Sequence, residues 1–360
     1  MTPRPLNDVG RRERALETAR RAGADALLAA RPSTVTWLTG FAVEIETGPS
    51  PFTLSPLALI TADGPPVLIV SDDDAEAARG AGCETSSYRG FSVEPIDAVG
   101  GATRALVAAV DGRRVATEAG ALPAALAAAI AWVDIGDRLR PAQAVKDPDQ
   151  LELIRAAIAL CDVGQREARS RAEPGMTELE LWTLVRGAIE REAGERTPIL
   201  ADLVAGPRTA ATGGAPEGRA MREGELVLCD LVPRRAGYWG DSCATFAVGE
   251  PSDEAIRRHG QAHERLIRVL DAVRPGAVAR DLDSLAREGL DYPHHSGHGL
   301  GADWHEEPRI VPRSDTVLEA GMVVAFEPGS YGEDVGARVE QVVVVTDDGC
   351  EVLSQHSLDL

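Results

Sequence analysis

The stretch from Leu226 to Phe246, LVLCDLVPRRAGYWGDSCATF, constrains this chain most, because two strand-like runs flank a turn rich in Pro, Arg and Gly. This pattern is typical of a β-hairpin. Each run carries one carboxylate among apolar residues, Asp230 in the first and Asp241 in the second. If the turn is centred on Arg235 and Ala236, the two aspartates are direct cross-strand partners with Cβ atoms about 4.5–5.5 Å apart. Two buried carboxylates that close require a compensating cation, so the hairpin predicts a metal site.

A pair of aspartates taken alone is more often a surface feature or a turn cap than a site, so other candidate ligands matter. Four of the seven histidines of the chain lie within residues 294–305, where glycines separate them. Glycine permits close backbone approach and unusual φ values, which suits a loop that binds a ligand. A single histidine is more often a structural residue. Four histidines interleaved with glycines indicate a functional loop. They are His294, His295, His298 and His305.

Two more carboxylates stand in apolar, strand-like runs, Glu327 at the end of VVAFEPG and Glu340 inside ARVEQVVVV. A buried carboxylate without a partner costs several kcal/mol or becomes protonated. Arg338 is available for an ion pair with one of these acids, but it cannot explain four acids on different strands. An oxygen-rich set of four carboxylates and one imidazole, that of His298, suits Mn²⁺, Fe²⁺ or Co²⁺ better than structural zinc. Five ligands suit two ions roughly 3.5–4 Å apart.

Length and composition restrict the classes of protein that remain. A chain of 360 residues is expected to form two domains. The net charge of −20 argues against nucleic-acid and anionic-membrane partners. Five scattered cysteines without a CxxC spacing indicate reduced thiols. The first residues lack the apolar core of a signal peptide, and no apolar run is long enough to span a membrane, so we expect a soluble, cytoplasmic protein.

The first part of the chain alternates between strand and helix patterns, which predicts an α/β domain. A domain boundary is expected near Pro141. The expected helices cover 8–23, 72–82, 102–110 and 121–130, and the expected strands cover 24–30, 35–42, 54–63, 65–72 and 115–120.

The second part begins with an amphipathic helix from about Gln150 and continues with a helix over 177–193, for which Thr177 and Glu180 form a capping box. A Gly-rich loop over 206–219 precedes the hairpin. The remaining pattern predicts a helix capped by Ser252 or Asp253, a helix over 281–290, and strands over 321–331 and 337–349.

Asp230, Asp241, His298 in GHGLG, Glu327 in EPG and Glu340 in RVE follow one another in an order that resembles the pita-bread metallohydrolases. That family includes aminopeptidase P, prolidase, methionine aminopeptidase and the metal-free creatinase. The runs TVTWLTGF and RPAQAVKDPDQLELIRAA resemble its amino-terminal domain and linker. The resemblance implies a creatinase/prolidase-like α/β domain over residues 1–142. A pita-bread catalytic domain, α+β with pseudo-two-fold symmetry, would cover 143–360.

The same resemblance implies a role for each ligand. Asp230 binds one ion, and Asp241 and Glu340 bridge both ions. His298 binds the other ion, and Glu327 binds it too and shuttles a proton. The cofactor is then two divalent ions, Mn²⁺ first, with Fe²⁺, Co²⁺ or Zn²⁺ as alternatives.

Two other histidines acquire catalytic roles from the resemblance. His305 would contact the substrate and support the tetrahedral intermediate, and His294 would lie in the substrate pocket. The reaction implied is hydrolysis of an amide C–N bond by a metal-bridging hydroxide. Its substrates are Xaa-Pro dipeptides or short peptides, and the enzyme is a cytoplasmic homodimer.

One residue departs from the family pattern. The peptidases carry a histidine at the end of the Gly-rich loop, where this chain has Gly213, and no histidine occurs from 196 to 258. The loss of such a donor costs a few kcal/mol of transition-state stabilisation. A small non-peptide amide or amidine, as for a creatinase- or ectoine-hydrolase-like enzyme, is therefore the alternative substrate. Arg208 either replaces the donor by binding a substrate carboxylate or forms a salt bridge within the loop.

Two further interpretations complete the expectations. A pseudoenzyme that keeps the fold as a binding surface is the rival to an enzyme, although five intact ligands argue against it. His259 and His263, four residues apart on an Arg-rich helix, lack a third ligand and the acid of an HExxH motif. We therefore place both on a solvated helix face.

Overall fold

The structure is a computed structural model that describes residues 9–45 and 52–360. The chain divides into two compact units, residues 1–143 and 144–360. Each unit has its own sheets and its own hydrophobic clusters. None of the described helices combines the length and the apolar character needed to cross a membrane.

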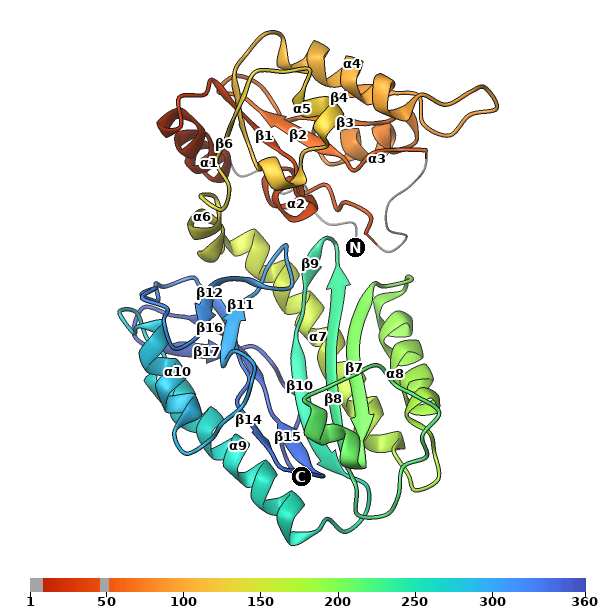
Figure 1. Ribbon diagram of the computed structural model, residues 1–360, viewed down its shortest axis with the longest axis vertical. Helices are drawn as coiled ribbons and strands as arrows, with labels where there is room; N and C mark the ends of the chain where they lie inside the picture. The colour runs from red at the N-terminus through yellow and green to blue at the C-terminus, as the bar shows by residue number, and fades with distance from the viewer. Residues whose placement is uncertain (1–8, 46–51) are drawn as a thin grey trace. The chain divides into compact units, whose positions relative to one another are not determined.

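The first unit is built on a six-stranded mixed sheet with the strand order β4-β3-β2-β1-β5-β6 (Figure 1). Strand β2 is antiparallel to β1 and β3, and the other pairs are parallel. This mixture of strands and helices confirms the α/β prediction. The bounds are α1 Val9–Arg21, β1 Ala26–Ala29, α2 Pro32–Thr39, β2 Leu57–Ile60, β3 Val67–Ser71, α3 Ala75–Gly80, β4 Glu84–Tyr88, α4 Ala98–Val110, β5 Val115–Thr117, α5 Ala124–Ala127, β6 Trp132–Asp134 and α6 Arg140–Ala144.

One predicted element of this unit is wrong. Residues 35–42 were expected to form a strand, but most of them belong to the helix α2. Pro32 stands at its start, where its fixed φ suits the first turn, and Gly40 ends it with a left-handed φ of 71°. Residues 34–39 are all buried, so the helix shows no amphipathic period and its β-branched residues imitate a strand. Residue 8, the predicted start of the first helix, lies outside the described residues.

The second unit repeats one arrangement, in which two helices precede a set of antiparallel strands. Helices α7 and α8 precede the sheet β10-β8-β7, and α9 and α10 precede the sheet β12-β11-β13-β16-β17. Figure 1 shows α8 at one edge of these strands, with α9 and α10 at the other. The helix bounds are α7 Pro148–Arg171, α8 Glu178–Ala193, α9 Asp253–Ala272 and α10 Ala279–Arg287.

The strands of this unit position the candidate ligands, which lie on a strand or directly next to one. Each half has its own hydrophobic cluster between helices and sheet, one around Leu181 and Leu203 and one around Leu266 and Val343. The strand bounds are β7 Ile199–Ala205, β8 Leu226–Arg235, β9 Tyr238–Trp239, β10 Ser242–Ala247, β11 Gly297–Gly299, β12 Glu306–Ile310, β13 Val323–Phe326, β14 Gly329–Tyr331, β15 Gly336–Arg338, β16 Gln341–Val345 and β17 Cys350–Val352.

The capping signals were predicted correctly in this unit. Thr177 and Glu180 form the reciprocal capping box of α8, in which the Thr177 hydroxyl accepts from the Glu180 amide at 3.1 Å. Ser252, one of the two expected caps, accepts from the Ala255 amide at the start of α9.

The hairpin is present, but its predicted register is wrong. The turn residues are Ala236 and Gly237, which both have positive φ, 49° and 87°. Two-residue hairpin turns of this kind favour glycine, which adopts such angles without strain. The partner of Asp230 across the ladder is therefore Cys243 instead of Asp241. Because this register differs from the predicted one by an even number of residues, both aspartates stay on one face.

The expectation for His259 is also wrong. Its side chain is buried, its ring stacks on that of His263 with centroids 6.0 Å apart, and burial lowers its pKa. The charged residues of α9 suggested a solvated face, whereas His259 lies on the same face as the buried Ala255, Ala262 and Leu266. Neither histidine lines the cavity that holds the candidate ligands.

Candidate metal centre

The five predicted ligands come together in one cavity of about 570 Å³ within the second unit. Asp230 and Asp241 come from one hairpin and the other three from later segments, and each lies on a strand or directly next to one. Glu340 was expected inside a strand but lies between β15 and β16, where its amide donates to Cys243 O at 2.8 Å. The lining consists of Asp230, Asp241, His298, Glu327 and Glu340 together with Leu200, Ala201, Asp202, Val232, His294, His295, Trp304, His305 and Arg338.

The imidazole of His298 is oriented as a metal ligand would be. Its Nδ1 lies 2.9 Å from Gly299 O, and because a carbonyl only accepts, Nδ1 carries the proton. The lone pair of Nε2 therefore points into the cavity, where Asp241 Oδ2 and Glu327 Oε1 each lie 3.5 Å away. The candidate ligand atoms of Asp241, His298 and Glu340 all lie within 4.8 Å of one another.

Two buried carboxylate oxygens in this cavity accept no hydrogen bond from the described residues, Asp230 Oδ1 and Glu340 Oε1. An unsatisfied buried acceptor costs about 1–3 kcal/mol, and more when it is charged. The donor set therefore fits a divalent cation, which would satisfy both oxygens.

Electrostatics lead to the same conclusion for three of the four acids. Burial raises the pKa of Asp230 to about 6, despite the neighbouring guanidinium of Arg338. Burial, together with the negative charges of Asp230 and Glu327, raises the pKa of Asp241 well above its usual range. Glu340 is shifted in the same direction by burial and by the charges of Asp241 and Asp230. Without added positive charge Asp241 and Glu340 keep their protons to higher pH than ordinary carboxyl groups, and a cation would favour their ionised forms.

Glu327 behaves differently from the other acids. Burial raises its pKa, but the hydrogen bond from His295 and the charges of His295, His298 and Arg338 outweigh burial and hold the pKa well below its usual range. Its carboxylate is therefore ionised at neutral pH.

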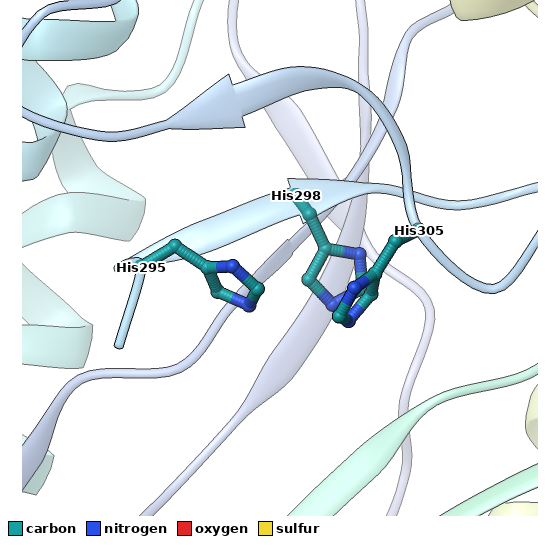
Figure 2. Close-up of side chains that lie close together, drawn as sticks. All are labelled: His295, His298 and His305. Atoms are coloured by element: carbon teal, nitrogen blue, oxygen red, sulfur yellow. The ribbon is translucent and has the colours of Figure 1, made fainter. Parts of the chain in front are cut away.

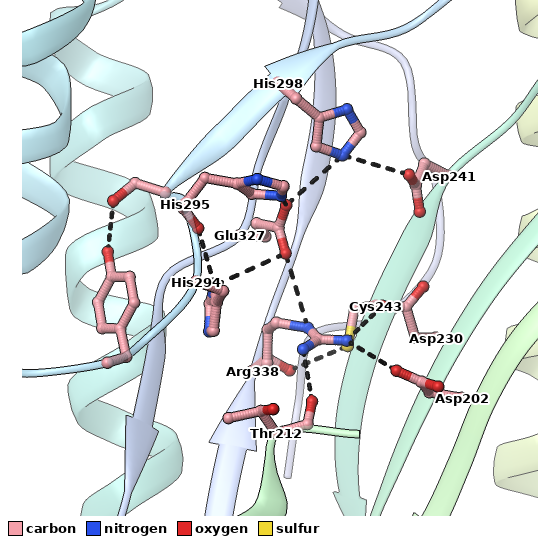
Figure 3. A network of polar contacts seen from close by, with 12 residues as sticks. Asp202, Thr212, Asp230, Asp241, Cys243, His294, His295, His298, Glu327 and Arg338 are labelled. Carbon is pink, nitrogen blue, oxygen red and sulfur yellow. Dashed lines mark hydrogen bonds and ion pairs between the residues drawn. The ribbon is translucent and has the colours of Figure 1, made fainter. Parts of the chain in front are cut away.

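Arg338 is the principal positive group of the cavity (Figure 3). Its Nη2 contacts Asp230 closely and lies 3.8 Å from Asp202 Oδ2, and its Nε lies 3.8 Å from Glu327 Oε2. Its Nη1 donates to Thr212 O at 2.6 Å. One guanidinium cannot neutralise this set of carboxylates, as the sequence analysis anticipated.

His295 is a functional candidate to which the sequence analysis gave no individual role. Its Nε2 lies 2.8 Å from Glu327 Oε1, and Arg309 Nη2 lies 3.3 Å from its Nδ1. Because a guanidinium only donates, Nδ1 accepts and the proton on Nε2 points at Glu327. Its place in the histidine-rich loop was a signal, but nothing in the sequence separates its role from that of His294.

The two histidines with predicted catalytic roles lie at the same cavity. His294 Nε2 is 2.9 Å from Tyr331 Oη, and burial lowers the His294 pKa to about 4. The His305 ring packs against His298 with centroids 4.0 Å apart, as Figure 2 shows. Partial burial of this ring and the charges of His298 and His295 lower the His305 pKa to about 3. Both imidazoles are neutral at pH 7. The N–H of His294 is on Nδ1, which donates to His295 O at 2.7 Å, whereas His305 can donate an N–H to a bound molecule.

Arg208 does not take the place of the absent loop histidine. Its Nη1 pairs with the buried Glu178, and its Nη2 lies 3.1 Å from Glu217 and 2.9 Å from Ala215 O. It does not line the cavity. Of the two roles considered for Arg208, the structure therefore shows the salt bridge.

A carboxylate-rich cavity that four histidines also line, in a unit of two similar helix–sheet halves, defines a class, the metal-dependent hydrolases of the pita-bread type. Comparison with known proteins specifies the family. The model of metallopeptidase family M24 matches residues 152–347, and the creatinase/prolidase N-terminal domain matches residues 11–143. The chain belongs to metallopeptidase family M24. The predictions of family, of fold class and of a metallohydrolase related to Xaa-Pro peptidases are confirmed at this level.

Individual relatives agree with this assignment. The chain is 30% identical to the Xaa-Pro dipeptidase of Pyrococcus furiosus over 234 residues, which cover 63% of this chain and 67% of that protein. A probable dipeptidase PepE of Mycobacterium tuberculosis is 32% identical over 63% of each chain. These alignments span about two thirds of the curated relatives. The solved Xaa-Pro dipeptidase of Bacillus anthracis shares the fold, with a TM-score of 0.83, 24% identity, and coverage of 98% of this chain and 100% of that one.

Proposed function

We propose that this protein is a hydrolase of amide C–N bonds that depends on two divalent metal ions. One observation carries the proposal. Four carboxylates and an imidazole converge in one cavity, and two of the buried carboxylate oxygens lack a hydrogen-bond partner among the described residues. Such a set is costly to fold unless cations compensate it.

The proposed ligand sets are those that the resemblance to the family implies. Asp241 and Glu340 would be shared by the two ions, Asp230 would complete one ligand set, and His298 and Glu327 would complete the other. The oxygen-rich donors favour Mn²⁺, with Fe²⁺, Co²⁺ and Zn²⁺ as alternatives. When bound, the ions supply Lewis acidity, which polarises the amide carbonyl and lowers the pKa of a bound water.

Side chains of the protein would transfer the proton, stabilise the transition state and contact the substrate. The ionised Glu327 accepts a proton and passes it to the leaving nitrogen, while His295 holds its Oε1 by the contact at 2.8 Å. His305 is more than one third exposed and donates an N–H to the oxygen that gains negative charge in the transition state. His294, which contacts Tyr331, lines the side of the pocket that receives the substrate.

Xaa-Pro dipeptides are the first substrate class in this proposal, because relatives from Pyrococcus furiosus and Bacillus anthracis carry that name. A small non-peptide amide or amidine is the second, and Gly213 is the observation that favours it. The proposal also includes a cytoplasmic homodimer, and the free state of all five thiols supports a reducing compartment. Light scattering of the purified protein measures the oligomeric state.

The experiment is an activity screen of Mn²⁺-loaded protein on Xaa-Pro dipeptides and on small cyclic or N-methylated amides. Metal-dependent release of proline or amine is the expected result. If no substrate is turned over and the protein neither holds metal nor gains stability from Mn²⁺, the pseudoenzyme alternative replaces this proposal.

A further inference from the structure

Asp202 places a carboxylate in the cavity that no metal-ligand assignment uses. It lies on β7, directly opposite Asp230 on β8. Its side chain is 40% exposed, whereas that of Asp230 is 16% exposed and that of Asp241 is 6% exposed. Asp202 is therefore accessible to a molecule that enters the cavity, while the predicted ligands lie deeper.

The nearest positive group leaves Asp202 only loosely paired. Arg338 Nη2 is 3.8 Å from Asp202 Oδ2, but the same nitrogen contacts Asp230 more closely, and Nη1 donates to Thr212 O (Figure 3). At that distance no hydrogen bond joins the two groups, and the Asp202 side of the pair is open to solvent. A cationic group of a substrate can compete with this pair.

Gly213 makes the room that Asp202 occupies. A Cβ atom on Gly213 would lie 2.0 Å from Asp202 Oδ2 and 2.7 Å from its Cγ. A side chain at position 213 is therefore incompatible with this position of the carboxylate. The peptidases that the chain resembles carry a histidine at the place of Gly213. This chain thus presents an anionic acceptor where those enzymes present an imidazole donor.

We propose that Asp202 recognises a positively charged nitrogen of the substrate, an ammonium, guanidinium or amidinium group carried beside the bond that is cleaved. This inference rests on the proposed function and specifies its substrate class. Charge-assisted hydrogen bonds to a carboxylate are the stronger kind, and Asp202 is the carboxylate of this cavity that the proposed ions leave unused. Lys-Pro and Leu-Pro share the α-ammonium group, and Lys-Pro carries a second ammonium group on its side chain, which is the cation proposed to contact Asp202.

The test compares Lys-Pro with Leu-Pro. Wild-type protein is expected to prefer Lys-Pro by about tenfold or more in kcat/KM, the usual worth of a hydrogen bond to a charged group. Asp202→Asn keeps the shape and removes the charge, so it should bring the ratio close to one. Gly213→Ala should displace the Asp202 carboxylate and lower the ratio in the same way. Gly218→Ala, in the same loop but with no atom within 4 Å of the added Cβ, is the matched control.

Metal content is measured in every variant, so that a lost ion is not mistaken for lost recognition. If Asp202→Asn keeps the preference for Lys-Pro, the assignment of Asp202 is wrong. If neither peptide is cleaved by wild type, peptide hydrolysis fails as the proposed function, and calorimetric binding of both peptides to EDTA-treated protein decides the role of Asp202. Tighter binding of Lys-Pro that Asp202→Asn abolishes supports that role, and equal binding of both peptides to wild type overturns it.

Discussion

His295 Nε2 donates a hydrogen bond of 2.8 Å to Glu327 Oε1, the oxygen that also lies 3.5 Å from His298 Nε2. The contact fixes the carboxylate beside the imidazole with which it is proposed to share an ion. Partners that orient metal ligands in this way are worth about 10–100-fold in metal affinity. His295 therefore belongs to the metal centre although it is not proposed as a ligand.

Removal of the His295 donor should weaken metal binding. His295→Phe keeps a ring but cannot donate, so its affinity for Mn²⁺ should fall by about 10–100-fold. His295→Gln keeps an N–H and should lose less. Chelator competition measures both affinities, with His263→Phe, which alters a histidine outside the cavity, as the control. Wild-type affinity in His295→Phe would show that the contact is incidental.

Substitutions of His298 and His305 should have different effects on metal binding and on kcat. His305→Ala is expected to keep its metal and to lose about 10²–10³ in kcat, as when one donor to a developing oxyanion is removed. His298→Ala should lose metal affinity first. Metal analysis together with steady-state kinetics distinguishes the two. Equal loss of metal in both variants would mean that the wrong histidine is assigned.

The raised pKa of Asp241 makes a prediction for the metal-free protein. A carboxylate whose pKa is raised on folding binds more protons in the folded state, so stability falls as pH rises above the unfolded value of about 4. In EDTA, Asp241→Asn should match wild type near pH 4 and should be more stable at pH 7, by at least about 1 kcal/mol or 2–4 °C in Tm. Thermal melts across this range measure the difference. A variant less stable than wild type at pH 7 would contradict the buried, uncompensated carboxylate.

Lys146, the lone lysine of the chain, forms a buried ion pair with Glu306, the residue after His305. The two side chains are 1% and 7% exposed. Lys146→Met leaves the Glu306 charge buried and should cost about 3–5 kcal/mol in the free energy of unfolding. The exposed pair Arg155–Glu351 is the control, and Arg155→Met should cost about 0–1 kcal/mol. Denaturant unfolding compares the two, and equal costs would show that burial does not determine them.

The sequence was most informative for two kinds of feature. These are hydrogen bonds between residues close together in the chain, and buried charges whose free-energy cost requires a partner. Thr177 and Glu180 mark a helix start by their own hydrogen bonds, and Asp230 or Glu340 in apolar runs requires compensation wherever the chain places it. Contacts set by tertiary packing could not be predicted. Asp202 was not singled out from the sequence, and only the approach of Gly213 and Arg338 shows its place. The register of the hairpin depended on which two residues adopt positive φ.

The central claim is that the five ligands hold two divalent ions, and metal stoichiometry tests it most directly. Wild-type protein dialysed against Mn²⁺ and freed of excess ion should hold two ions per chain by elemental analysis, and EDTA should lower its Tm, because the ions bind the folded state. Asp241→Ala removes a carboxylate between the ions and should hold at most one ion, with no hydrolytic turnover. Two ions and full activity in Asp241→Ala would contradict the assignment.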